Sequence, residues 1–206
     1  MDCRSRRKAI RLCASRSNSR HEVPGVTQRP ERLFIAVQLT EDTRRKIASG
    51  LGNLPGRIVP PQNWHFTLRF LGSTSAEDRD ALVSILRRTN LGRIFAIRFG
   101  SLGAFPREKR ARILWIGISE GAGELVALAE KIETAVRQAG FPSESRPFQP
   151  HLTLSRIDPP RSVTDVMTEQ KSLAVSMKVS EVTLVRSSLG GGPARYEIVE
   201  SFPLDA

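Results

Sequence analysis

The sequence predicts an α+β fold of two pseudo-symmetric lobes, each a mainly antiparallel sheet with helices packed outside. The tetrapeptide pattern His-x-Thr-Leu occurs twice, at residues 65–68 and 151–154, and the two histidines are 86 residues apart. In both halves of the chain an apolar run of strand length precedes the motif by roughly thirty to forty residues, and a helical pattern lies between them. The repeated order indicates a structural duplication, with both motifs in a central cleft.

The first half of the chain alternates apolar runs with helical segments. Thr40 offers a helix N-cap after the first run and is followed by two acidic residues. Ser75, with Asp78 three residues later, opens a second helix. The elements expected in this half are a strand at 33–39, a helix to about 51, the motif strand at 65–71, a helix from 75 and a strand at 93–102.

The second half repeats this order. Four apolar residues at helical spacing mark a helix that ends before Gly140, and three prolines precede the second motif. The elements expected here are a strand at 112–119, a helix at 123–139, the motif strand at 151–157, a short helix near 162–170 and a final hairpin of strands 175–187 and 195–202 around a glycine run.

Composition divides the chain into a tail and a folded part. Residues 1–30 carry eight Lys and Arg against Asp2 and Glu22, which is more than half of the net charge of +11. This basic N-terminal extension lacks apolar periodicity and is predicted to be disordered, so that 31–206 form a single bilobal domain. Both cysteines lie in the extension, which fits a reducing, cytoplasmic location. No apolar run has the length of a membrane span, and we expect a monomer without membrane attachment.

Each motif presents an imidazole beside a hydroxyl. Residues i and i+2 of a strand point to the same face, so His65 lies beside Thr67 and His151 beside Thr153. With an ordinary pKa of about 6.5, one histidine can accept a proton while the other donates one. The hydroxyls can hold phosphate oxygens whose charge grows in the transition state. A strained 2′,3′-cyclic phosphate is a suitable electrophile that needs no metal and no cofactor.

These residues are also compatible with other roles. A single H-x-T-L motif could be purely structural, and two histidines could belong to a zinc site, although no cysteine or acidic residue completes the ligand set. Trp115 lies in an apolar run and is assigned to the core. Arg156 stands five residues after His151, an odd offset that places it on the opposite face of an ideal strand. Anion binding by Arg156 would therefore require a bulge or a strand end.

In these motifs the chain resembles the 2H phosphoesterases, specifically their RNA 2′,3′-cyclic phosphodiesterase or 2′-5′ RNA ligase-like branch. The resemblance covers about 32–204. It rests on Arg32-Leu33-Phe34-Ile35-Ala36, Trp64-His65-Phe66-Thr67-Leu68-Arg69-Phe70-Leu71-Gly72, Leu114-Trp115-Ile116-Gly117, Pro150-His151-Leu152-Thr153-Leu154-Ser155-Arg156, and Leu184-Val185-Arg186-Ser187 with Tyr196-Glu197.

The resemblance implies a role for each site residue. It assigns His65 as proton donor and His151 as proton acceptor, with Thr67, Thr153 and Arg156 binding the substrate phosphate. The implied reaction opens a 2′,3′-cyclic phosphate at the end of an RNA or nucleotide and leaves a 2′-phosphate. Two alternatives remain at this point: a non-catalytic protein that binds RNA or nucleotide phosphate in the same cleft, and reversible 2′-5′ RNA ligation.

Overall fold

The structure is a computed structural model that describes residues 29–170, 173–188, 190 and 194–206. The expected disordered extension lies almost entirely outside the described residues, as do residues 191–193 of the glycine run in the last hairpin. The first strand of the described residues begins at Glu31. Among the described residues, no helix is both long enough and apolar enough to cross a membrane.

The strands form two sheets, and every pairing between named strands in the described residues is antiparallel. The first sheet has the order β3 (His65–Thr74), β1 (Glu31–Gln38), β8 (Glu181–Ser188), β9 (Arg195–Pro203). The second sheet has the order β2 (Arg57–Ile58), β6 (Leu152–Arg161), β5 (Ala111–Glu120), β4 (Phe95–Phe105), β7 (Ser176–Val179). Each sheet therefore contains one motif strand, β3 or β6, as predicted.

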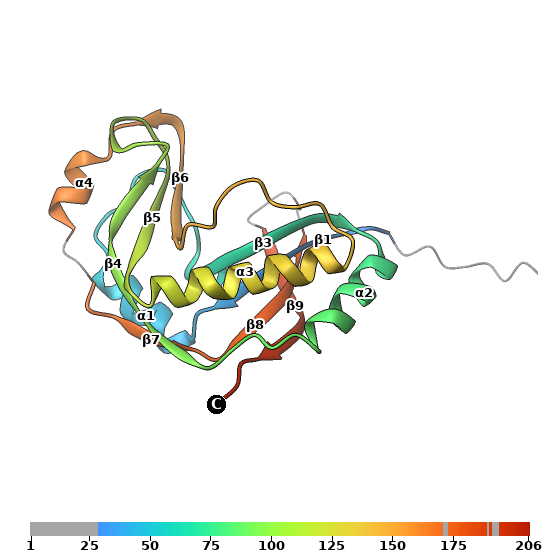
Figure 1. Cartoon of the computed structure of the whole chain (residues 1–206). Coiled ribbons are helices and arrows are strands. Elements are labelled where there is room, and N and C mark those ends of the chain that lie inside the picture. The colour runs from blue at the N-terminus through green and yellow to red at the C-terminus, as the bar shows by residue number, and fades with distance from the viewer. Residues whose placement is uncertain (1–28, 171–172, 189, 191–193) are drawn as a thin grey trace, which may run out of the picture.

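The helices begin at the caps that the sequence indicates. The Thr40 hydroxyl accepts a hydrogen bond from the backbone N–H of Thr43, and the Ser75 hydroxyl accepts one from that of Asp78. The helices are α1 (Glu41–Gly50), α2 (Ala76–Leu86), α3 (Ala122–Gln138) and α4 (Thr164–Glu169), with short 3-10 turns η1 (Pro61–Asn63) and η2 (Glu108–Arg110). In Figure 1, α3 runs along the first sheet with α2 at its end, and α1 and α4 lie toward the second sheet.

The two sheets are not the two halves of the chain. The segment 175–187, predicted as one strand, is divided at Ser180 into β7 and β8, which belong to different sheets. β7 pairs with β4, whereas β8 pairs with β1 and β9. The prediction of one continuous strand was wrong because the apolar pattern runs through the crossing and carries no sign of a change of partner.

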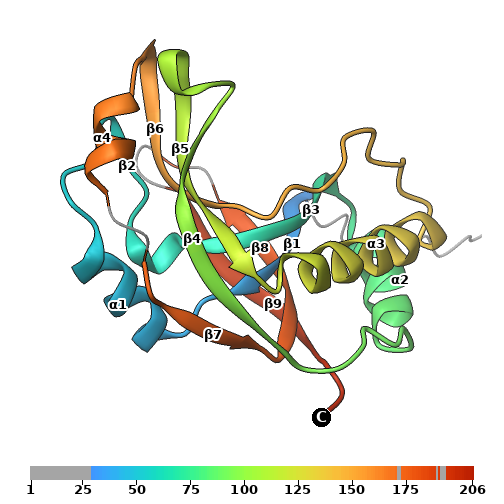
Figure 2. The ribbon, with the colours of Figure 1, turned by 60° about the vertical axis from the view of Figure 1, so that its left-hand side comes forward.

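One cluster of buried apolar side chains is shared by both sheets. Phe66 of β3 stacks on Phe99 of β4, with ring centroids 5.8 Å apart, and both rings are fully buried. Leu152 and Leu154 of β6 enter the same cluster. The turned view in Figure 2 shows β4, β5 and β6 rising from the level of the first sheet. The motif residues that point away from the histidines thus pack into a common core, as predicted.

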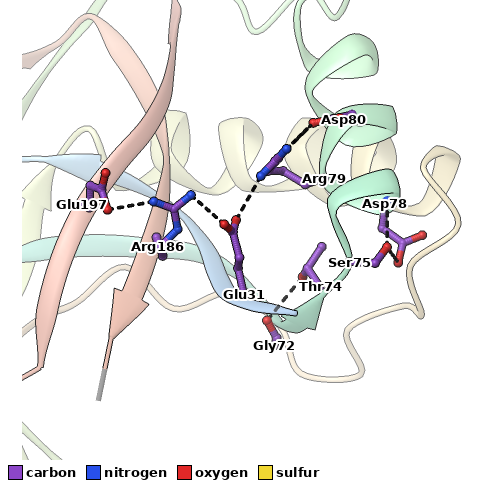
Figure 3. Close-up of polar contacts among 9 residues, drawn as sticks. All are labelled: Glu31, Gly72, Thr74, Ser75, Asp78, Arg79, Asp80, Arg186 and Glu197. Atoms are coloured by element: carbon purple, nitrogen blue, oxygen red, sulfur yellow. Dashed lines mark hydrogen bonds and ion pairs between the residues drawn. The ribbon is translucent and has the colours of Figure 1, made fainter. Parts of the chain in front are cut away.

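A network of charged side chains surrounds the beginning of β1 (Figure 3). The Glu31 carboxylate accepts hydrogen bonds from Arg186 of β8 at 2.7 Å and from Arg79 of α2 at 3.3 Å. Arg186 also donates to Glu197 of β9 at 2.8 Å, and Arg79 pairs with the exposed Asp80. Because Glu31 is partly buried and bridges two arginines, it joins three strands and a helix.

We predict that Glu31→Gln lowers the free energy of unfolding by about 1 kcal/mol, since two arginines lose their shared charged partner. Asp80→Asn is the matched control: it removes an exposed partner of the same Arg79 and should cost well under that amount. Urea denaturation of the three proteins measures both effects. Equal destabilisation by the two substitutions would contradict a central role for Glu31.

Candidate active site

The two motif histidines are held by the same local hydrogen bond. Nδ1 of His65 lies 2.8 Å from the carbonyl oxygen of Asn63, and Nδ1 of His151 lies 2.7 Å from that of Gln149. A carbonyl oxygen can only accept, so Nδ1 of each ring carries the hydrogen. The neutral form of each ring therefore keeps its lone pair on Nε2, which has no partner among the described residues.

The two histidines also occupy matching aromatic surroundings. The ring of His65 contacts Phe34 of β1, at a centroid distance of 4.8 Å, and Tyr196 of β9, at 5.2 Å. The ring of His151 lies against Phe105 of β4 at 5.2 Å and Trp115 of β5 at 6.1 Å. The aromatic rings restrict the orientation of each imidazole and exclude water from its faces.

Trp115 is the one side chain here whose sequence assignment needs correction. It is only partly buried and contacts His151, so it forms part of the wall of the site as well as packing against Phe105. The apolar run around it gave no sign of this, because the register of β5 against β6 decides which side of the sheet it occupies. That register places Trp115 opposite Thr153.

The motif threonines follow their histidines on the same face. On β3, Thr67 pairs with Ala36 of β1, and His65, two positions earlier, pairs with Gln38. Thr67 and Thr153 are both half-buried, and neither hydroxyl has a hydrogen-bond partner within the described part of the chain. Both hydroxyls are therefore available to a ligand that lies beside the histidines.

Each motif strand carries an extra residue at the leucine of its motif. Ile35 and Ala36 are neighbours on β1, and their partners on β3 are Arg69 and Thr67. Leu68 therefore has no register partner on β1. Leu114 and Trp115 are neighbours on β5, and their partners on β6 are Ser155 and Thr153. Leu154 therefore has no register partner on β5. Such a β-bulge reverses the alternation of side chains from that point onward.

The bulge in β6 moves Arg156 to the face of His151. Leu154 and Ser155 are both buried although they are neighbours, while Arg156 is exposed. The five-residue offset from His151 would place Arg156 on the opposite face of an ideal strand, and the extra residue of the bulge returns it to the face of His151. Its guanidinium has no ion pair or hydrogen bond among the described residues, and its positive charge lowers the pKa of both His65 and His151.

The bulge in β3 places an aromatic ring at the position that corresponds to Arg156. Phe70 stands five residues after His65, is 61% exposed, and has its ring 6.0 Å from that of Phe34. Phe34 in turn contacts His65. An exposed aromatic face next to a phosphate-binding group is a surface on which a nucleobase can stack. The two halves of the site therefore differ, with a cation on one side and an aromatic ring on the other.

Arg69 connects the first motif strand to the segment that precedes the second. Its side chain, 10% exposed, donates to Glu133 of α3 at 2.7 Å and to the carbonyl oxygen of Pro142. Glu133 in turn accepts from the backbone N–H of Glu144 at 3.0 Å. Residues 141–150 lead directly to His151, so this cluster fixes the approach of the chain to the second histidine.

Burial and neighbouring cations lower the pKa of both histidines. Desolvation is the main cause at His65, where it and the charges of Arg44 and Arg156 outweigh the hydrogen bond to Asn63 and bring the pKa to about 4. Desolvation also lowers the pKa of His151. Without a ligand, both rings are therefore neutral at pH 7. The His151 charge contributes to the lowered pKa of His65, and β3 contacts β6, so the two motifs lie close together.

Within the described ranges, no group of three or more His, Cys, Asp or Glu side chains is placed to hold a metal ion. The side chains at this site are instead two imidazoles, two hydroxyls and the guanidinium of Arg156. This set can bind a phosphate group and transfer protons on opposite sides of it.

Comparison with known proteins places this chain among phosphate-ester enzymes. Residues 53–191 match the model of the 2′-5′ RNA ligase superfamily. An Escherichia coli (strain K12) protein named RNA 2′,3′-cyclic phosphodiesterase is 33% identical over 183 residues, which cover 85% of this chain and 97% of the relative. A protein of the same name from Aquifex aeolicus (strain VF5) is 33% identical over 154 residues, covering 72% and 82%.

The fold is similar to that of solved relatives. The crystal structure of Escherichia coli LigT complexed with 3′-AMP superposes with a TM-score of 0.68 at 30% identity. The superposition covers 85% of this chain and 98% of LigT. The predicted architecture of two antiparallel sheets with outer helices is thereby confirmed.

We predict that sulfate raises the pKa of His65 from about 4 toward the ordinary value of about 6.5, because a bound anion stabilises the imidazolium. By linkage, sulfate should bind more tightly as the pH falls through this range, since sulfate itself keeps its charge. Titration of the histidine ring resonances by NMR, with and without sulfate, measures the change. In the matched variant Arg156→Gln the pKa of His151 should rise without sulfate, because a positive charge is removed. A His65 titration that sulfate leaves unchanged would argue against anion binding beside this ring.

Proposed function

Because this chain belongs to the 2′-5′ RNA ligase superfamily, we propose that it hydrolyses 2′,3′-cyclic phosphate ends of RNA or nucleotides to 2′-phosphates by two-histidine acid–base catalysis. The observation that carries the proposal is the matched pair of histidines, each with Nδ1 bound to a carbonyl oxygen and with no partner for Nε2 in the described part of the chain. The relatives named RNA 2′,3′-cyclic phosphodiesterase support the substrate class. The 3′-AMP complex of LigT supports a ligand of nucleotide size.

His151 acts as the base in this mechanism. Its lowered pKa keeps the imidazole neutral at pH 7, so Nε2 can take a proton from a water molecule. The water oxygen forms a bond to phosphorus while the bond from phosphorus to O3′ breaks. The products are a 2′-phosphate and a 3′-hydroxyl.

His65 acts as the acid and gives its Nε2 proton to the departing O3′. The pKa of about 4 in the free protein would leave the His65 ring unprotonated at pH 7. Substrate binding must therefore raise the pKa of His65 before the ring can act as the acid. The cyclic phosphate carries a negative charge, which offsets the charges of Arg44 and Arg156 and raises the pKa of His65. Activity should therefore decline at high pH, as the bound complex loses this proton.

The remaining site residues hold the phosphate. Arg156 has no partner in the part of the chain that the structure describes, and its charge acts on both histidines, so its guanidinium can bind the non-bridging oxygens. The free hydroxyls of Thr67 and Thr153 can donate to the same oxygens from the two motif strands. These donors act where negative charge increases in the transition state, and they supply the stabilisation that a metal ion supplies elsewhere.

We predict that His65→Ala and His151→Ala each lower turnover of a nucleoside 2′,3′-cyclic phosphate by about two to four orders of magnitude. Affinity for a nucleoside 2′-phosphate should fall much less, because Arg156 and the threonines remain. Steady-state kinetics and calorimetry measure the two quantities, and Thr134→Ala on the exposed side of α3 is the control. Near-normal turnover in either histidine variant would rule out the two-histidine mechanism, and a non-catalytic phosphate-binding protein would show no turnover even in the wild type.

We predict that excess EDTA leaves turnover unchanged and that the product carries its phosphate on O2′, because the two histidines replace a metal-bound water and O3′ is the leaving group. Chelation followed by end-group analysis by phosphorus NMR checks both points. Loss of activity on chelation that zinc restores would contradict the mechanism. With a 5′-hydroxyl oligonucleotide in excess, a 2′-5′-linked product would show that the same site also performs ligation.

A further inference from the structure

Arg44 is a buried cation without an adequate partner. It is the fourth residue of α1, and its side chain is only 18% exposed. Its one ion pair within the described ranges is with Glu41 at 3.8 Å, and the Glu41 side chain is 76% exposed. The Nε hydrogen of Arg44 is buried and has no hydrogen-bond partner among the described residues. A guanidinium that is removed from water in this way costs free energy unless a ligand binds it.

The fold places Arg44 beside the first motif histidine. β1 ends at Gln38, which is the register partner of His65, and α1 begins three residues later. α1 also contacts η1, which contains Asn63, the residue whose carbonyl oxygen holds the His65 ring. Arg44 is therefore linked to His65 through both the strand and the turn that position it.

The Arg44 charge acts on His65, whereas the Arg156 charge acts on both histidines. The Arg44 charge lowers the pKa of His65 more than the Arg156 charge does. The Arg156 charge also lowers the pKa of His151. A phosphate between the two histidines would thus be bound by Arg156, and Arg44 would face the next anionic group of the ligand.

In an RNA chain, the next anion is the phosphodiester that joins the terminal nucleotide to its neighbour. Building on the proposed function, we propose that Arg44 binds this phosphodiester and gives the enzyme a preference for RNA ends over mononucleotides. A buried guanidinium suits this group, since it forms charge-assisted hydrogen bonds with two phosphate oxygens. A nucleoside 2′,3′-cyclic phosphate lacks this phosphodiester and cannot make the contact with Arg44.

Two substrates and two variants test the proposal. The substrates are a nucleoside 2′,3′-cyclic phosphate and a dinucleotide that ends in the same cyclic nucleotide. Arg44→Gln should lower kcat/KM for the dinucleotide by about tenfold to a hundredfold, the usual effect of losing a hydrogen bond to a charged group. The mononucleotide value should change by less than about threefold. Arg45→Gln, at an exposed arginine of the same helix paired with Asp42, should alter neither.

The ratio of kcat/KM for the two substrates separates phosphodiester binding by Arg44 from the effect of the Arg44 charge on the pKa of His65. Loss of the Arg44 charge also raises the pKa of His65, but this change affects both substrates alike and cancels in the ratio. Equal losses on both substrates, or no loss on either, would overturn the proposal. A dinucleotide with an uncharged methylphosphonate linkage should be a poorer substrate for the wild type and should be insensitive to Arg44→Gln.

Binding of products tests Arg44 independently of turnover. The wild type should bind a dinucleotide with a 2′-phosphate end more tightly than the matching 2′-mononucleotide, and Arg44→Gln should remove most of that difference in calorimetry. A wild type that binds both 2′-phosphate products but does not hydrolyse the cyclic mononucleotide would refute the proposed function alone. Equal affinities of the wild type for the two products would refute the role of Arg44 alone.

Discussion

The site depends on one constraint, the burial of the apolar residues of both motif strands in a single core. Phe66 and Leu68 from β3 enter the same cluster as Leu152 and Leu154 from β6, and Phe66 stacks on Phe99 across the two sheets. A strand alternates its side chains, so fixing these residues inside turns each histidine and threonine to the other face. The chemistry of the site is thus set by packing on its reverse side.

The paired bulges give the two halves of the site different tasks. Both motif strands gain one residue at the motif leucine, which brings the fifth residue after each histidine back to the histidine face. That residue is the unpaired Arg156 in one strand and the exposed Phe70 in the other. A duplicated scaffold therefore provides a cationic side and an aromatic side, which suits the ligand of phosphate and base that we propose.

The histidines share their orientation but not their electrostatic environment. Equivalent hydrogen bonds from Nδ1 leave both Nε2 atoms free, whereas Arg44 and Arg156 both act on His65 and only Arg156 on His151. Local geometry thus makes either ring able to carry a proton. The charges around the rings, including those of the substrate, decide which ring carries it and when.

The sequence alone determined most of the elements and the motif residues, because these depend on short-range patterns. The caps at Thr40 and Ser75, the alternation around His65 and His151, and the duplicated order of elements are all local, and the structure agrees with them. Only the tertiary structure decided which strands are partners and which side chains face the site. The crossing at Ser180, the placement of Trp115 beside His151 and the position of Arg44 near His65 each depend on register or contacts between segments distant in sequence. Arg156 illustrates the division: its spacing from His151 indicates the wrong face, and the pairing of β6 with β5 adds the extra residue that corrects it.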